Sequence, residues 1–251
     1  MELPYNTFNK LLSEEDLFKI LGKKHNNIDI YRKSFVHKSY CTRKNENFMN
    51  GNKMCPEGCI PLQEESNERL EFFGDSILNL VISDYIFERF PDDNEGFLTK
   101  MRTKLVNGKM LAFLSKEIKF DKLVIISKQI EENNGRNNSN IIEDVFEAFI
   151  AAIYLDLGFE SAKEWIVNVI ENIIDFPELI KQNHNYKDQF LKKYQQTYNY
   201  TPKFFEMNVE TNKNNIKTYT VCVKDDRGNI IAIGKGCNRK DAENNAAKNA
   251  S

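Results

Sequence analysis

The chain has 251 residues, of which 41% are hydrophobic, and its formal net charge is −2. This hydrophobic fraction is enough for a packed core and excludes global disorder, and the length predicts one or two domains. No apolar run reaches membrane-spanning length, and the first residues show no basic region followed by an apolar stretch. Five cysteines, an odd number, fit a reducing compartment better than a disulfide framework. We therefore expect an intracellular protein of the cytoplasm that does not act at a membrane.

The charge is unevenly distributed along the chain. From Asn185 to the end, 12 Lys and Arg stand against 7 Asp and Glu, whereas the preceding part has 23 against 30. A basic unit attracts a polyanion, and an acidic unit is able to hold cations. The asymmetry therefore predicts two units with different roles.

The first part of the chain is predicted to be almost entirely helical. Apolar periodicity and capping residues indicate helices at residues 11–21, 30–39, 66–90, 141–157 and 161–174, and one or two helices within 97–118. Either Ser66 or Asn67 is able to cap the third of these helices, and Trp165 is expected to pack in the core. Residues 41–65, rich in Asn, Gly and Pro, are expected to form a long loop, and residues 131–140 a polar one.

The pattern changes after a predicted linker at residues 177–184. A helix is expected at 187–198, strands at 203–209, 217–224 and 230–236, and an Ala-rich helix at 239–250. Residues 226–229 (DRGN) read as a hairpin turn. The expected fold is an all-α domain at 1–176, containing the long loop 41–65, followed by a small α+β module (α-β-β-β-α) at 185–251.

Two acidic pairs stand out in the helical part. Glu71 and Asp75 are four residues apart and Asp144 and Glu147 three apart, so each pair occupies one helical face. Glu68 shares the face of the first pair. Acids at this spacing are usually solvated, but both pairs lie among apolar residues, and buried carboxylates are costly unless paired or bound to metal. Helical spacing alone would equally allow Glu143 as the partner of Glu147.

Small residues lie beside both pairs, namely Gly74 in the first helix and Ala148 and Ala151 in the second. They would let the two helices approach closely, so that four carboxylates converge. Such an oxygen-rich site suits Mg²⁺, with Mn²⁺ able to substitute, and ions held in this way promote phosphodiester hydrolysis. The acidic pairs are therefore candidates for a hydrolytic metal site.

Several segments resemble those of the ribonuclease III family. Residues 67–78 (NERLEFFGDSIL) closely resemble the signature of that family. In the same order as in the family, residues 35–40 (FVHKSY), 95–102 (EGFLTKMR) and 144–156 (DVFEAFIAAIYLD) resemble its other motifs. The basic tail, with residues 239–242 (RKDA) near its end, resembles a double-stranded RNA-binding domain. The long loop 41–65 is longer than the family usually has.

The resemblance implies a helical nuclease domain that works as a homodimer and cuts double-stranded RNA with staggered breaks, leaving 5′-phosphate and 3′-hydroxyl ends. By position, the implied metal ligands are Glu71, Asp75, Asp144 and Glu147. Among them Asp75 and Glu147 match the catalytic residues, and the resemblance selects Asp144 rather than Glu143. Glu68 and Glu95 match supporting acids.

The resemblance also implies RNA contacts in the basic module, because duplex RNA is read by shape through phosphate and 2′-hydroxyl contacts. The expected contacts are Lys187, Gln189, Asn215, Arg239 and Lys240. Arg239 and Lys240, at the start of the last helix, are the strongest candidates because a helix N-terminus itself attracts phosphate.

Three other interpretations remain open at this point. In the first, the chain binds and sequesters duplex RNA without cutting it, which needs the basic tail but not the acids. In the second, the acids are surface residues of a purely structural helical domain. Separately, Cys41, Cys55 and Cys59, with His37 nearby, are of the types that bind zinc, although Cys41 is distant in sequence. We treat His37 as a packing or capping residue.

Overall fold

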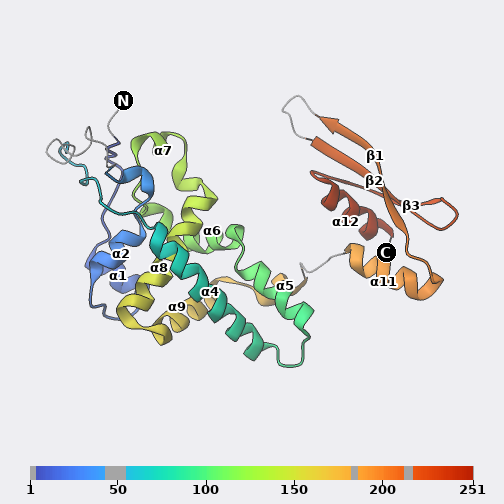
Figure 1. Cartoon of the computed structure of the whole chain (residues 1–251), viewed down its shortest axis with the longest axis horizontal. Coiled ribbons are helices and arrows are strands. Elements are labelled where there is room, and N and C mark those ends of the chain that lie inside the picture. The colour runs from blue at the N-terminus through green and yellow to red at the C-terminus, as the bar shows by residue number, and fades with distance from the viewer. Residues whose placement is uncertain (1–3, 43–54, 182–185, 212–216, 251) are drawn as a thin grey trace. The chain divides into compact units, whose positions relative to one another are not determined.

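The computed structural model describes residues 4–42, 55–181, 186–211 and 217–250. The chain divides into two compact units, Met1–Asp175 and Phe176–Ser251 (Figure 1). Within the predicted linker, α10 (Phe176–Lys181) forms a short helix in which Phe176 and Leu179 are buried. None of the helices in the described segments is long and apolar enough to cross a membrane.

The described part of the first unit consists of helices, 3₁₀ turns and the loops between them, which confirms the predicted all-α class. Its elements are α1 (Glu14–Leu21), α2 (Ile28–Ser34), η1 (Lys38–Tyr40), α4 (Glu68–Arg89), α5 (Glu95–Leu105), α6 (Gly108–Glu117), η3 (Phe120–Lys122), α7 (Lys128–Glu132), η4 (Gly135–Asn137), α8 (Ser139–Leu157) and α9 (Phe159–Ile173). Most boundaries lie within a few residues of those predicted, since caps such as Asn94, Asn107 and Asn138 accept a hydrogen bond from the first turn of their helix.

Helix α8 is the central helix of this unit and is buried along most of its length. Its Phe149 ring lies 4.8 Å from the Phe120 ring, 5.2 Å from Trp165 and 5.4 Å from Tyr31, measured between centroids. Trp165 is buried, and its indole nitrogen donates to the Ile20 carbonyl, which confirms its predicted place in the core. Aromatic rings from three other segments therefore fix the position of α8.

Helix α4 packs along α8 (Figure 1), but it is less buried than its apolar sequence predicts. Its residues Ile77, Leu78 and Val81 face the core, whereas Phe72 is 76% exposed and Phe87 70% exposed. Apolar residues around most of its circumference predict a largely buried helix, and for α4 this holds on one face only. The helix contacts the core with one face, and the first unit leaves the opposite apolar face uncovered.

The predicted polar loop 131–140 is more ordered than expected, because it contains the end of α7 and all of η4. Arg136 explains the difference. Its guanidinium pairs with Glu131 at 2.7 Å and donates to the main-chain oxygens of Asp121 and Val124. These contacts of the Arg136 side chain hold the segment against the core, where a polar sequence predicted a loop exposed to solvent.

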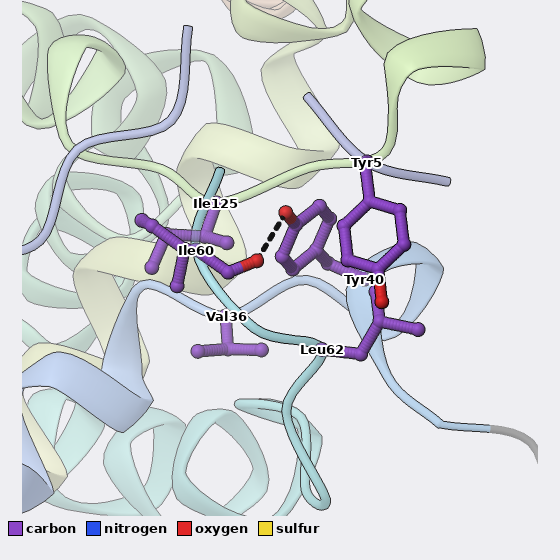
Figure 2. Packing of buried hydrophobic residues seen from close by; sticks show 6 residues of the cluster. All are labelled: Tyr5, Val36, Tyr40, Ile60, Leu62 and Ile125. Atoms are coloured by element: carbon purple, nitrogen blue, oxygen red, sulfur yellow. Dashed lines mark hydrogen bonds between the residues drawn. The ribbon is translucent and has the colours of Figure 1, made fainter. Parts of the chain in front are cut away.

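The described ends of the long loop 41–65 are anchored to the first unit, while residues 43–54 lie outside the described part. Residues 41 and 63 form an isolated parallel bridge. Figure 2 shows six buried residues that join the loop to the N-terminal segment and to the core: Tyr5, Val36, Tyr40, Ile60, Leu62 and Ile125. The Tyr40 hydroxyl donates to the Ile60 carbonyl at 2.7 Å. Cys41, Cys55 and Cys59 pack against this apolar cluster.

The second unit has the predicted order of helix, three strands and helix after α10. Its elements are α11 (Tyr186–Tyr198), β1 (Lys203–Thr211), β2 (Lys217–Lys224), β3 (Ile230–Gly236) and α12 (Arg239–Ala250). The antiparallel sheet has the order β1-β2-β3, with Val223 opposite both Phe204 and Ala232. The β2–β3 turn closes with Gly228 at φ 84°, a conformation that favours glycine.

Helix α12 lies directly on β3 because both surfaces consist of small residues. A methyl group added to Gly234 would lie 2.1 Å from the Ala246 nitrogen, and one added to Gly236 would lie 2.5 Å from the Ala242 nitrogen. Ala242, Ala246 and Ala247 are fully buried. The glycines of the third strand and the alanines of the last helix thus form one interface.

Candidate active site

The two acidic helices meet at Gly74. A methyl group added there would lie 1.8 Å from the main-chain oxygen of Glu147, so α4 and α8 approach as closely as their backbones allow. Leu70, Ala148 and Ala151 form a buried cluster beside this crossing. The small residues singled out in the sequence therefore allow the helices to approach closely. One acidic pair belongs to α4 and the other to α8.

The four carboxylates differ in burial. Glu147 is 6% exposed and is the one acidic residue among the buried residues of the described part. Glu71 and Asp144 are half-buried, and Asp75 is exposed. The site therefore has a closed side at Glu147 and an open side at Asp75.

Burial and mutual repulsion raise the pKa values of these acids. The pKa of Glu147 is raised to about 8, mainly by burial and then by four nearby negative charges, from Asp75, Glu143, Glu71 and Asp144. Burial, followed by the charges of Glu71 and Glu143, raises the pKa of Asp144 to about 6. Burial and then Asp75 raise the pKa of Glu71. These mutual effects show that both pairs share one electrostatic site with an excess of negative charge.

This donor set fits a divalent cation. All the contributing groups are carboxylates, the ligands that Mg²⁺ and Mn²⁺ prefer, and a cation would relieve their repulsion. As the side chains stand, no group of three or more His, Cys, Asp or Glu within the described residues is arranged to hold a metal ion. The same finding applies to the three loop cysteines, so the zinc interpretation gains no support.

Lys38 is the cation at the edge of the site. Its Nζ lies 3.0 Å from Glu68 Oε1, and its charge lowers the pKa of Asp144 against the larger effect of burial. His37 precedes it and accepts a hydrogen bond from the Ser39 nitrogen, which agrees with a capping role. Glu68, predicted as a supporting acid, is thus ion-paired and exposed in this chain.

The start of α4 is fixed by hydrogen bonds of Ser66 and Asn67. The Asn67 nitrogen donates to the Val36 carbonyl at 2.8 Å, and its side-chain nitrogen donates to the Ser34 carbonyl. Of the two residues predicted as alternative caps, Asn67 makes no capping hydrogen bond with its side chain, whereas the Ser66 hydroxyl accepts from the Glu68 nitrogen at 3.4 Å. These contacts hold the segment carrying Lys38 against the first acidic helix.

The sequence interpretation missed Asn79 as a neighbour of the site. Its side-chain nitrogen donates to Asp75 Oδ1 at 2.7 Å and to the Asp75 carbonyl at 2.9 Å. Spacing by four residues on a helix was the signal that would have found it. Glu95, by contrast, is exposed in the first turn of α5, accepts a hydrogen bond from Thr99, and does not contribute to the raised pKa values of Asp144 and Glu147.

In the basic module, two of the predicted RNA contacts lie together. Lys187 pairs with Glu243 at 2.6 Å, and Arg239 pairs with the same carboxylate at 3.0 Å. Gln189 and Lys240 are exposed. Asn215 lies outside the described residues. Asn238, which was not predicted, caps α12 by accepting a hydrogen bond from the Asp241 nitrogen, and this orients the first turn that carries Arg239.

Comparisons with known proteins agree with this architecture. A family model described as Ribonuclease-III-like matches residues 27–174, and the double-stranded RNA binding motif matches residues 186–251. Ribonuclease 3 of Leptospira interrogans is 32% identical over 95% of this chain and 90% of its own length. A probable ribonuclease 3 of Acanthamoeba polyphaga mimivirus is 33% identical over 97% of this chain, which spans only 46% of that longer relative. The solved nuclease domain of Campylobacter jejuni ribonuclease III is 31% identical and superposes with a TM-score of 0.52 over 64% of this chain and 97% of its own.

A helical nuclease domain followed by a duplex-RNA-binding module defines a double-strand-specific endoribonuclease. The chain belongs to the ribonuclease III family. Nucleases of this family generally require a divalent metal ion. Membership of the family decides against the two non-catalytic interpretations of the sequence.

Proposed function

We propose that this endoribonuclease cuts both strands of duplex RNA with Mg²⁺, for which Mn²⁺ substitutes, held by Glu71, Asp75, Asp144 and Glu147. The observation that carries the proposal is the buried Glu147 carboxylate, which lies at the α4–α8 crossing among other carboxylates that raise its pKa. A buried acid without a partner destabilises a fold, so its position is understandable if it serves to bind a cation.

When bound, the ions supply an activated water and stabilise the departing oxygen of the phosphodiester. The protein's own residues prepare for that step. Glu147 carries a proton near neutral pH in the absence of a cation, and releases it when positive charge arrives. Asn79 fixes the orientation of the Asp75 carboxylate at the open side of the site. The products would be 5′-phosphate and 3′-hydroxyl ends with a stagger between the two strands.

The decisive experiment replaces Glu147 by Gln in the full chain. Mg²⁺-dependent cleavage of an end-labelled RNA duplex should fall at least about 100-fold, while duplex binding changes less than about twofold. Glu132→Gln, an exposed acid on α7, is the matched control and should cleave normally. Undiminished cleavage by the Glu147 variant would remove this residue from the mechanism. Mapping the ends released by the unmodified protein tests the predicted end chemistry and stagger.

We also propose that the nuclease domain forms a homodimer through the uncovered face of α4. Phe72, Leu80 and Phe87 are 76, 58 and 70% exposed, and lie within roughly 80° of helical arc. An exposed apolar stripe of this kind usually marks an interaction surface. A structure of the related Campylobacter jejuni domain is described by its flexibility in a region involved in dimer formation.

The dimer proposal predicts that Phe72→Glu combined with Leu80→Glu yields a monomer by light scattering at micromolar concentration, because charge on the stripe prevents its burial. The same double change at the exposed residues Phe8 and Phe18, away from α4, should leave the mass unchanged. A monomeric unmodified protein, or a variant that still dimerises, would contradict this interface.

The cysteines bear on where the protein acts. All five are free thiols, which supports an intracellular, reducing location such as the cytoplasm.

A further inference from the structure

Glu143 is an acid that the family motif leaves out and the structure places at the site. It precedes Asp144 on α8 and lies one helical turn before Glu147. Its side chain is half-buried between α8 and α6. The two helices pack against each other, and the Glu143 carboxylate lies at their contact, beside Gly108.

The position of the Glu143 carboxylate depends on the absence of a side chain at residue 108. A methyl group added to Gly108 would lie 2.2 Å from Glu143 Oε2 and 2.7 Å from Oε1. Gly108 is the first residue of α6, a ten-residue helix capped by Asn107. The carboxylate thus rests against a bare helix N-terminus, where the helix dipole favours a negative charge.

Glu143 lies four residues before Glu147 on α8, so the two side chains share one face of the helix. In agreement with this geometry, its charge contributes to the raised pKa values of both Glu147 and Asp144. Glu143 is therefore a fifth acidic group beside the proposed ligands. Nothing in the motif that defines the four ligands requires it.

We infer that Glu143 is a positioning residue that strengthens divalent-cation binding by the acidic quartet, and that Gly108 holds it in place. The inference rests on the proposed metal site. Its physical basis is that the number of negative charges around a site sets its affinity for a hard divalent cation. The contact with Gly108 keeps that charge close to the ligands without placing it among them.

Two substitutions test the two parts of the inference in the full chain. Glu143→Gln removes the charge. Gly108→Ala keeps the charge but displaces it, and the cost to the fold is small because the group that must move is the end of a flexible side chain. Isothermal titration of the RNA-free protein with Mg²⁺, and separately with Mn²⁺, should show roughly three- to tenfold weaker binding for each variant.

The double variant should bind the metal no more weakly than Glu143→Gln alone, because both changes act on the same carboxylate. Cleavage by each variant should return to near the unmodified rate at saturating Mg²⁺, with only the half-saturating concentration raised. Gly96→Ala, in the first turn of α5, and Glu132→Gln are matched controls and should leave the metal affinity unchanged.

Unchanged affinity in Glu143→Gln would overturn the inference. Unchanged affinity in Gly108→Ala, or additive losses in the double variant, would overturn the role of the glycine contact. A cleavage defect that persists at saturating Mg²⁺ would also contradict it, because Glu143 would then act on the reaction itself. If the unmodified protein binds no divalent ion, or Glu147→Gln cleaves normally, the proposed function fails instead, whatever the Glu143 variants do.

Discussion

At the scale of single residues, Glu147 combines two features that the fold would otherwise avoid. It is almost fully buried, and the charges closest to it are of its own sign. Its position follows from the backbone, because the carbonyl of the same residue contacts Gly74 of the neighbouring helix. The main chain at Glu147 therefore cannot move outward without separating α4 from α8.

The stability of the metal-free protein should therefore depend on pH. The pKa of Glu147 rises from 4.5 to about 8 on folding, so the folded state binds more protons than the unfolded state between these values. Stability then falls as pH increases through this window. We expect the melting temperature in EDTA to decrease from pH 5 to pH 8, and Glu147→Gln to flatten that decrease. Asp144, with a pKa of about 6, contributes to the lower part of the window. A variant that melts with the same pH dependence as the unmodified protein would refute this account.

At the scale of elements, the contact between α4 and α8 determines whether a site exists at all. Helices with ordinary side chains pack at axial distances of about 8–10 Å, and bare backbone at Gly74 allows the closer end of that range. The contacts of Phe149 with the rings of Phe120 and Trp165 hold α8 in the core. The two helices that carry the acidic pairs are therefore positioned by packing against each other and against the aromatic core.

Replacing Gly74 by Ala should disrupt this contact. The new methyl group would meet the Glu147 carbonyl, which belongs to the backbone and cannot move aside, so the helices must separate. We expect a loss of about 1–3 kcal/mol or more in the free energy of unfolding, measured with urea, together with loss of cleavage. Gly96→Ala, whose added methyl group has only the Asn94 side chain nearby, should change the stability by less than about 1 kcal/mol. Full activity in the Gly74 variant would show that close approach is unnecessary.

At the scale of the whole molecule, charge is divided between two units. The acidic nuclease unit contains the carboxylates, and the basic module contains Lys187 and Arg239, both oriented by Glu243. This division lets one part of the chain hold cations while another attracts the polyanionic substrate. The net charge of −2 conceals both properties.

Removing Arg239 and Lys240 together should weaken substrate binding without altering the chemical step. Each lost phosphate contact lowers the salt dependence of binding by roughly 0.7–0.9 in the logarithmic slope. The double alanine variant should thus raise KM for duplex RNA, reduce the salt slope by up to about 1.8, and leave kcat nearly unchanged. Lys192→Ala with Lys193→Ala removes the same charge from an exposed part of α11 and is the control. An equal effect of both pairs would mean that total charge, and not these two positions, determines binding.

The sequence by itself determined the fold class, the order of the elements and the family. Helical periodicity, asparagine caps and the glycine of the β2–β3 turn are local features, and they were sufficient to place most helices and strands. The signature around Glu71 and Asp75 was specific enough to indicate the chemistry. Spacing on a helix predicted that the two acids of each pair share one helical face.

Only the tertiary structure decided what lies around those residues. It showed that Arg136 orders a segment predicted as a loop, that α4 leaves an apolar face uncovered, and that Glu143 rests on Gly108. The reason is physical: burial, ion pairing and close backbone contact depend on segments far apart in the chain, and periodicity within one helix carries no information about its neighbours. Thus the sequence identified the acidic pairs, and the crossing at Gly74 brought them together.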